Sequence, residues 1–128
     1  MALTPSNVNE EKPWLQYYPE WTAHSLEYED HTLRDLYLNN LSKNVSRIAT
    51  RFFGRTQTFG ELDREVRRAA AGLKAFGVRP GDRVAIMLPN CPQHVAAFFA
   101  VQLIGGVVVE HNPLYTAHEL RPQFLDHG

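Results

Sequence analysis

Apolar positions recur at helical spacing in two polar stretches of the chain. Leucine and tyrosine side chains recur from residue 33 to residue 41, and Thr32 with Asp35 has the spacing of a capping box, so a short helix to about residue 43 is predicted. Thr58 and Glu61 repeat this spacing before a longer amphipathic segment, which Gly77 should end. The predicted buried face of that second helix consists of Leu62, Val66, Ala69, Ala70, Leu73 and Phe76.

Short apolar runs between these segments indicate strands. Residues 46–53 mix β-branched and aromatic side chains, and a two-residue turn at Gly54-Arg55 would lead into residues 56–59 as a β-hairpin. Residues 83–88 and 107–109 are apolar runs bounded by turn formers, hence predicted buried strands. A helix over residues 93–104 lies between them, apolar almost all round and ended by two glycines. Strand, helix and strand at this spacing predict a parallel crossover, so the fold class is α/β.

The amino-terminal third differs in composition. Residues 1–12 are polar and are expected to form a frayed tail. Residues 13–31 hold both tryptophans and three tyrosines without a helical or alternating period, so they are interpreted as an extended arm. Packing of its aromatics over the edge of the domain is the favoured interpretation, and an exposed ligand-binding rim is the alternative.

The sequence MLPNCPQH at residues 87–94 lies between the first apolar strand and the apolar helix, where a phosphate loop would fall. It contains no glycine, and its two prolines remove amide donors, so a structural corner is favoured over anion binding. Cys91 would gain thiolate character at a helix start, but a nucleophile also needs a base, and His94 is the one nearby candidate. An inert buried thiol is the favoured interpretation of Cys91.

Other groups that could carry chemistry give weak patterns. The six histidines, at positions 24, 31, 94, 111, 118 and 127, form no i, i+4 pair, which argues against a metal site. The acidic pairs Glu10-Glu11 and Glu29-Asp30 are interpreted as solvated. Arg64, Arg67 and Arg68 share a helix face, but acidic neighbours dilute it and no aromatics interleave, so a solvated face is expected. From these patterns alone, no catalytic, cofactor-binding or metal-binding side chain is identified.

Composition and charge limit the partners and the cellular location that can be expected. Thirteen basic against 14 acidic residues give a net charge of -1, so no nucleic-acid partner is expected. The single cysteine excludes an internal disulfide and fits a cytoplasmic location. No secretory signal pattern opens the chain, and no run of about eighteen apolar residues occurs.

An ordered series of motifs within residues 56–120 resembles the amino-terminal part of the adenylate-forming acyl-CoA synthetases. The series is TFGELD, GVRPGDRVAIMLPN, GGVVV and NPLYTAHEL, and the arm KPWLQYYPEW is similar to that of fatty acyl-CoA ligases. Glu110 departs from the pattern, since many relatives have proline there. The resemblance implies an arm and tail over 1–31 and an incomplete, truncated amino-terminal part of the AMP-binding synthetase domain over 32–128.

The resemblance also implies a function for the longer enzyme. Such an enzyme would use ATP, Mg²⁺ and coenzyme A to convert a long-chain fatty acid into acyl-AMP and then acyl-CoA. The 128 residues lack the family's phosphate loop and catalytic lysine, so they are expected to bind none of these cofactors and to be inactive alone, with the remainder of the synthetase as partner. Self-association of the fragment is expected from uncovered apolar surface. Three alternatives stay open. The longer enzyme could associate peripherally with a membrane, or its substrate could be a non-fatty (aromatic or amino) acid. The chain could also be a stand-alone binding or assembly module on the same scaffold.

Overall fold

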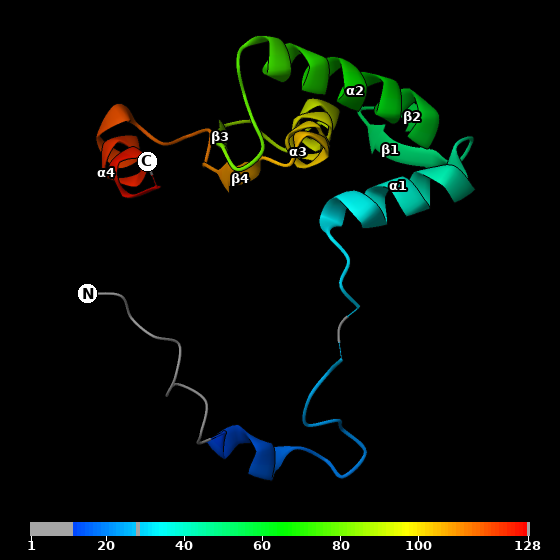
Figure 1. Cartoon of the computed structure of the whole chain (residues 1–128), viewed down its shortest axis with the longest axis vertical. Coiled ribbons are helices and arrows are strands. Elements are labelled where there is room, and N and C mark those ends of the chain that lie inside the picture. Colours follow the sequence, from blue (N-terminus) through cyan, green and yellow to red (C-terminus); the bar gives the residue numbers. More distant parts are fainter. Residues whose placement is uncertain (1–11, 28, 128) are drawn as a thin grey trace. The chain divides into compact units, whose positions relative to one another are not determined.

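The computed structural model describes residues 12–27 and 29–127, which divide into two units at residues 30 and 31 (Figure 1). The first unit contains the 3₁₀ helix η1 (Pro13–Tyr17), which begins at a proline and ends where Tyr18 becomes extended. The predicted arm is therefore not extended throughout. A proline fixes the backbone torsion needed at a helix start, and the Leu15 amide closes onto the Lys12 carbonyl at 3.0 Å, a local turn too short to show as a period. Most of the predicted tail lies outside the described residues.

Three helices of the second unit follow a threonine whose amide donates to an acidic side chain three positions later. Thr32 caps α1 (Leu33–Asn44) and Thr58 caps α2 (Phe59–Ala75), each in a reciprocal capping box with an acidic residue three positions later, which confirms both predictions. The Thr58 amide donates to Glu61 Oε2 at 2.8 Å. The third, α4 (Ala117–His127), was not predicted, although the Thr116 amide donates to Glu119 Oε2 at 2.7 Å in the same way. Pro122 inside α4 obscures its helical pattern.

The predicted hairpin is present, but its turn lies one residue earlier than expected. Strand β1 (Ile48–Phe52) pairs antiparallel with β2 (Arg55–Thr58), and Phe52 faces Arg55, so Phe53 and Gly54 form the turn. Both have positive φ, 45° and 78°, as a type I′ turn requires. Because Phe53 is an unusual residue for a left-handed conformation, the sequence did not point to it. Its ring is 92% exposed.

The parallel unit follows the predicted order. Strand β3 (Arg83–Ile86), helix α3 (Pro92–Ile104) and strand β4 (Val107–Glu110) follow one another, and β3 pairs with β4 in parallel from Arg83↔Val107 to Ile86↔Glu110. Gly105 ends α3 at φ 87°, and the Gly106 amide donates to the Val101 carbonyl at 3.0 Å. The α/β class, with a hairpin and a β-α-β unit, is confirmed.

The core lies between α2 and α3, with α1 against both helices (Figure 1). The hairpin contacts α2, and the two parallel strands contact α3. The buried residues of this core are Tyr37, Leu62, Val66, Ala70, Ala96, Ala100 and Ile104. Phe76, predicted on the buried face of α2, is 91% exposed because it is the C-cap residue, beyond the last helical turn.

The two parallel strands are less buried than predicted. Only Ile86 of β3 and no residue of β4 is buried among the described residues, and Val107 is 47% exposed. A strand becomes buried only when other elements cover both faces of its sheet. This sheet has two strands, so each is an edge strand with few neighbours to cover it. Within residues 12–27 and 29–127, no helix combines the length and the apolar composition needed to cross a bilayer.

We predict that Phe53→Asn stabilises the folded chain. Asparagine tolerates the left-handed conformation that Phe53 adopts. Because Phe53 is 92% exposed, the substitution loses little packing beyond its edge-to-face contact with Phe52. The free energy of unfolding should rise by roughly 1 kcal/mol. Urea unfolding followed by circular dichroism measures this. Phe76→Asn is the matched control, since Phe76 is equally exposed at an ordinary φ of -75°; a similar gain there, or a loss in Phe53→Asn, would contradict the turn assignment.

Acid should weaken the helix starts. Hydrogen bonds from Thr58 hold the pKa of Glu61 below its ordinary value of 4.5, and bonds from Thr32 and Thr116 lower the pKa of Asp35 and Glu119. A depressed pKa in the folded state gives stability that is complete above the unfolded-state pKa and is lost as the pH falls through the folded-state pKa.

Stability should therefore fall as the pH drops below about 4.5, and Glu61→Gln should flatten part of this dependence. Urea midpoints measured across this range test the prediction. Glu65→Gln, exposed on the same helix outside the cap, is the control. An unchanged slope in Glu61→Gln would show that its carboxylate is not coupled to folding.

Candidate functional site

The MLPNCPQH segment forms the corner between β3 and α3. Strand β3 ends at Ile86, and α3 begins at Pro92 with Cys91 as the N-cap residue, whose side chain makes no capping hydrogen bond. The His94 amide donates to the Cys91 carbonyl at 3.0 Å. Because Pro92 has no amide proton, the first turn of α3 offers fewer donors to an anion than an ordinary helix start. The geometry fits a structural corner.

His94 does not pair with Cys91 as a general base would. Its Nε2 lies 2.9 Å from Glu110 Oε1, which joins the first turn of α3 to the end of β4. Cys91 is a free cysteine that is half-buried, whereas the sequence predicted a buried thiol. Glu110 therefore has a structural partner in His94. Among the described residues, no hydrogen bond links the Cys91 thiol to a base.

A mostly apolar groove lies between β1 and the first half of α3. It has a volume of about 570 Å³ and is lined by Thr50, Arg51, Phe52, Cys91, Val95, Phe98 and Phe99, among others. Its aromatic floor comes from α3, where Phe98 and Phe99 meet edge to face at 5.4 Å between ring centroids. Apolar walls of this kind can receive an apolar group. Cys91 and His94 also line the groove, but His94 Nε2 is bonded to Glu110 and no hydrogen bond joins it to the Cys91 thiol among the described residues.

A second groove, of about 660 Å³, adjoins the first and shares Thr50, Phe52 and Pro92 with it. Arg55 of β2 and the i, i+4 pair Arg64 and Arg68 of α2 line it together with Phe52 and Phe53. Arg64 and Arg68 are exposed, as expected of a solvated face, but the hairpin brings Phe52 and Phe53 into the same groove. Local sequence distance could not reveal this, since Phe53 and Arg64 are brought together by the packing of β1 and β2 on α2.

Two of the histidines are not ordinary surface residues. His111 is 5% exposed, its Nδ1 lies 2.8 Å from Gln123 Oε1, and its Nε2 lies 3.2 Å from His127 Nε2. These contacts join α4 to the end of β4. No group of three histidine, cysteine or acidic side chains suited to a metal ion occurs in the described part of the chain. Glu10 and Glu11 lie outside the described residues, while Glu29 and Asp30 are exposed.

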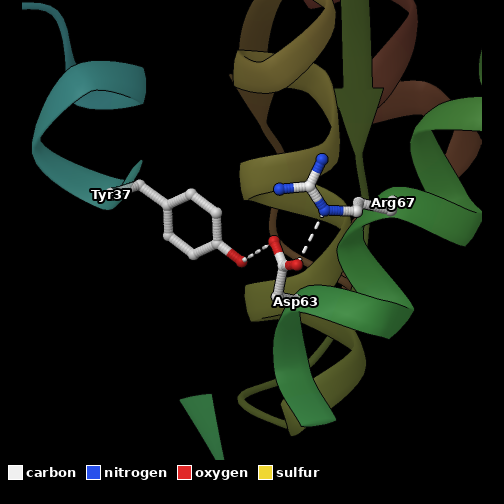
Figure 2. Close-up of polar contacts among 3 residues, drawn as sticks. All are labelled: Tyr37, Asp63 and Arg67. Atoms are coloured by element: carbon white, nitrogen blue, oxygen red, sulfur yellow. Dashed lines mark hydrogen bonds and ion pairs between the residues drawn. The ribbon is translucent and has the colours of Figure 1, made fainter. Parts of the chain in front are cut away.

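A buried tyrosine connects α1 to α2 through a charged pair (Figure 2). The Tyr37 hydroxyl donates to Asp63 Oδ1 at 3.1 Å, and Arg67 Nε donates to Asp63 Oδ2 at 2.7 Å. Tyr37 also stacks on Phe99 of α3 at 4.4 Å. Burial, and then the Asp63 carboxylate, raise the pKa of Tyr37, so it stays a protonated donor at neutral pH. The arrangement fixes three helices and offers no free group for catalysis.

This geometry is that of a scaffold with an α/β core, and comparisons with known proteins place it in a family. The sequence profile of the AMP-binding enzyme family matches residues 38–128. The chain belongs to the AMP-binding enzyme family.

Curated relatives include several fatty-acid ligases. The chain is 40% identical over 119 residues to a long-chain-fatty-acid–CoA ligase of Bacillus subtilis and 36% identical to one of Yersinia pestis. It is 45% identical over 75 residues to 4-coumarate–CoA ligase 2 of rice, a match that covers 59% of the chain. The chain spans about a fifth of the length of the fatty-acid ligases, 21% in both cases, and 13% of the rice enzyme.

Solved structures give the same placement. The chain is similar to O-succinylbenzoate coenzyme A synthetase from Bacillus subtilis in complex with AMP, with a TM-score of 0.68 at 35% identity over 72% of this chain and 24% of that one. It is also similar to the anthranilate CoA ligase AuaEII in complex with anthranoyl-AMP, with a TM-score of 0.69 at 25% identity over 75% of this chain and 19% of that one. The predicted family and fold are therefore confirmed.

A double-mutant cycle should separate the two contacts of Asp63. Tyr37→Phe is expected to cost about 1 kcal/mol of unfolding free energy, because a partly buried carboxylate loses its donor. Arg67→Ala should cost no more than about 0.5 kcal/mol, because that arginine side chain is 57% exposed and the pair is i, i+4 on one helix. Each variant is combined with Asp63→Ala and unfolded in urea. A larger coupling for Arg67 than for Tyr37 would reverse this ranking.

Proposed function

We propose that the chain is the amino-terminal segment of a long-chain fatty acid–CoA ligase. In that reaction the fatty acid carboxylate attacks the α-phosphorus of ATP, pyrophosphate leaves, and an acyl-AMP anhydride forms. The thiol of coenzyme A then attacks the acyl carbon, AMP leaves, and a thioester results. The mixed anhydride is needed because a carboxylate is a poor electrophile, and Mg²⁺ would offset charge on the phosphates.

The proposed substrate class, long-chain fatty acids, is supported by how much of the chain aligns with the fatty-acid ligases. An alignment over 119 of the 128 residues leaves out nine, so it necessarily spans residues 10–119 and includes the aromatic arm. The match to 4-coumarate–CoA ligase 2 covers 75 residues and is too short to hold both the arm and α4. The arm is thus shared with enzymes named for long-chain acids, which favours that substrate.

The segment itself contributes scaffold in this proposal. The corner before α3 has two prolines and no glycine, and no described cluster of acidic or histidine ligands could hold a metal ion, so the residues present do not fit ATP or Mg²⁺. The groups that act on the acyl and phosphoryl centres belong to the remainder of the synthetase, which is the expected partner of this segment. The 128 residues alone are expected to be inactive.

A second substrate class has specific support. The rice relative is more identical per residue than the fatty-acid ligases, and both solved relatives described above carry aromatic acids in their names. An aromatic-acid ligase built on the same scaffold is therefore the competing proposal, and a panel of acids decides between the two.

We predict that the protein encoded by the continuing reading frame releases AMP with ATP, Mg²⁺, coenzyme A and hexadecanoate, at least about tenfold faster in kcat/KM than with 4-coumarate or anthranilate. The 128-residue chain, assayed beside it, should form no thioester. Preference for either aromatic acid would overturn the fatty-acid proposal. Thioester synthesis by the purified 128-residue chain, or a stop codon directly after Gly128, would overturn the assignment as a segment of a longer ligase.

A further inference from the structure

Phe53 places a large apolar side chain in the turn of the hairpin, where the backbone conformation is unfavourable for phenylalanine. Phe53 has φ 45°, and such turns favour asparagine, aspartate or glycine. Phe53 is 92% exposed, and its ring meets that of Phe52 edge to face at 4.6 Å between centroids. A strained and exposed phenylalanine contributes little to the stability of the chain. A local rule broken in this way is typical of a functional surface.

Positive charge surrounds this ring. Arg51 and Arg55 flank the phenylalanines along the hairpin, and Arg64 and Arg68 of α2 line the adjacent groove. Among the described residues, Arg55, Arg64 and Arg68 make no ion pair. Two carboxylates, Glu61 and Glu65, line the same groove, and Glu61 is also bonded by Thr58 in the helix cap, so the four arginines Arg51, Arg55, Arg64 and Arg68 outnumber the acids beside them by two.

Charge is segregated along the chain as well. Residues 47–68 contain six arginines and three acidic residues, a net charge of +3, although the whole chain has a net charge of -1. The remaining residues are therefore acidic, with a net charge of -4. A locally positive segment of this kind attracts an anionic partner although the whole chain is slightly acidic.

We propose that Arg51, Phe52, Phe53, Arg55, Arg64 and Arg68, the hairpin-tip surface, dock on an anionic phospholipid bilayer. Phe53 enters the boundary between headgroups and acyl chains, and the arginines contact lipid phosphates. A nucleic acid is less suited to this surface, because the two phenylalanines pack edge to face on each other instead of offering separate stacking platforms. The inference does not rest on the ligase proposal, since vesicle binding is measured without substrate.

Co-sedimentation of the 128-residue chain with vesicles tests the proposal. The chain should bind vesicles of phosphatidylcholine with phosphatidylglycerol and should not bind phosphatidylcholine alone. Phe53→Asn should weaken binding about tenfold, the effect expected from withdrawing one phenylalanine ring from an apolar phase. Arg64→Gln and Arg68→Gln should each weaken it about fivefold. Salt should weaken it too, since screening shortens from about 10 Å at 0.1 M to about 3 Å at 1 M.

Two controls keep the result interpretable. Phe76→Asn removes an equally exposed phenylalanine at the other end of α2 and should bind vesicles like the parent chain. Thermal unfolding of each variant shows that it is folded, and Phe53→Asn should be at least as stable as the parent while binding less. Binding unchanged in Phe53→Asn, equal losses in Phe53→Asn and Phe76→Asn, or binding of single-stranded RNA in place of vesicles would overturn the proposal.

Discussion

The contact between α2 and α3 is the interaction on which the rest of the second unit depends. Val66 and Ala70 of α2 and Ala96 and Ala100 of α3 belong to one buried cluster, and Val66 and Ala100 are fully buried. Alanines let two helix backbones approach closely, so that van der Waals contact is made along the whole crossing. The hairpin contacts α2 and the parallel strands contact α3, so each is placed by this one helix pair.

The fixed helix pair also explains why the polar groups near the core are structural. Tyr37 reaches across from α1 to Asp63 while its ring stacks on Phe99, so a single side chain meets both helices of the pair. At the other end, His94 and Glu110 join the start of α3 to the end of β4. The first contact is partly buried and the second is exposed, and each joins two elements of the fold. His94 is a candidate base for Cys91 only when the sequence is considered without its partner Glu110.

Much of this fold could be predicted because its signals are local. A threonine followed three residues later by an acid is sufficient to start α1 and α2, since the cap is formed within four residues. The exposure of Phe76 and the turn at Phe53 could not be predicted in the same way. Whether Phe76 lies inside the last turn depends on where α2 ends, and a turn at Phe53 requires a conformation that phenylalanine rarely adopts. The start of α4 at Thr116 was predictable and was missed because Pro122 interrupts its pattern.

The grooves were beyond sequence reasoning for a different reason. Arg64 and Arg68 are visible as a pair on one helix face, but their aromatic neighbours come from a hairpin that precedes the helix and packs back on it. The neighbourhood therefore exists only after the core has formed. A strained Phe53 at the edge of that neighbourhood is consistent with selection for contact rather than for stability, because a residue kept for folding would be buried or would relieve the turn. The same scaffold that fixes the helix pair thus leaves the unfavourable turn at Phe53 where a partner can reach it.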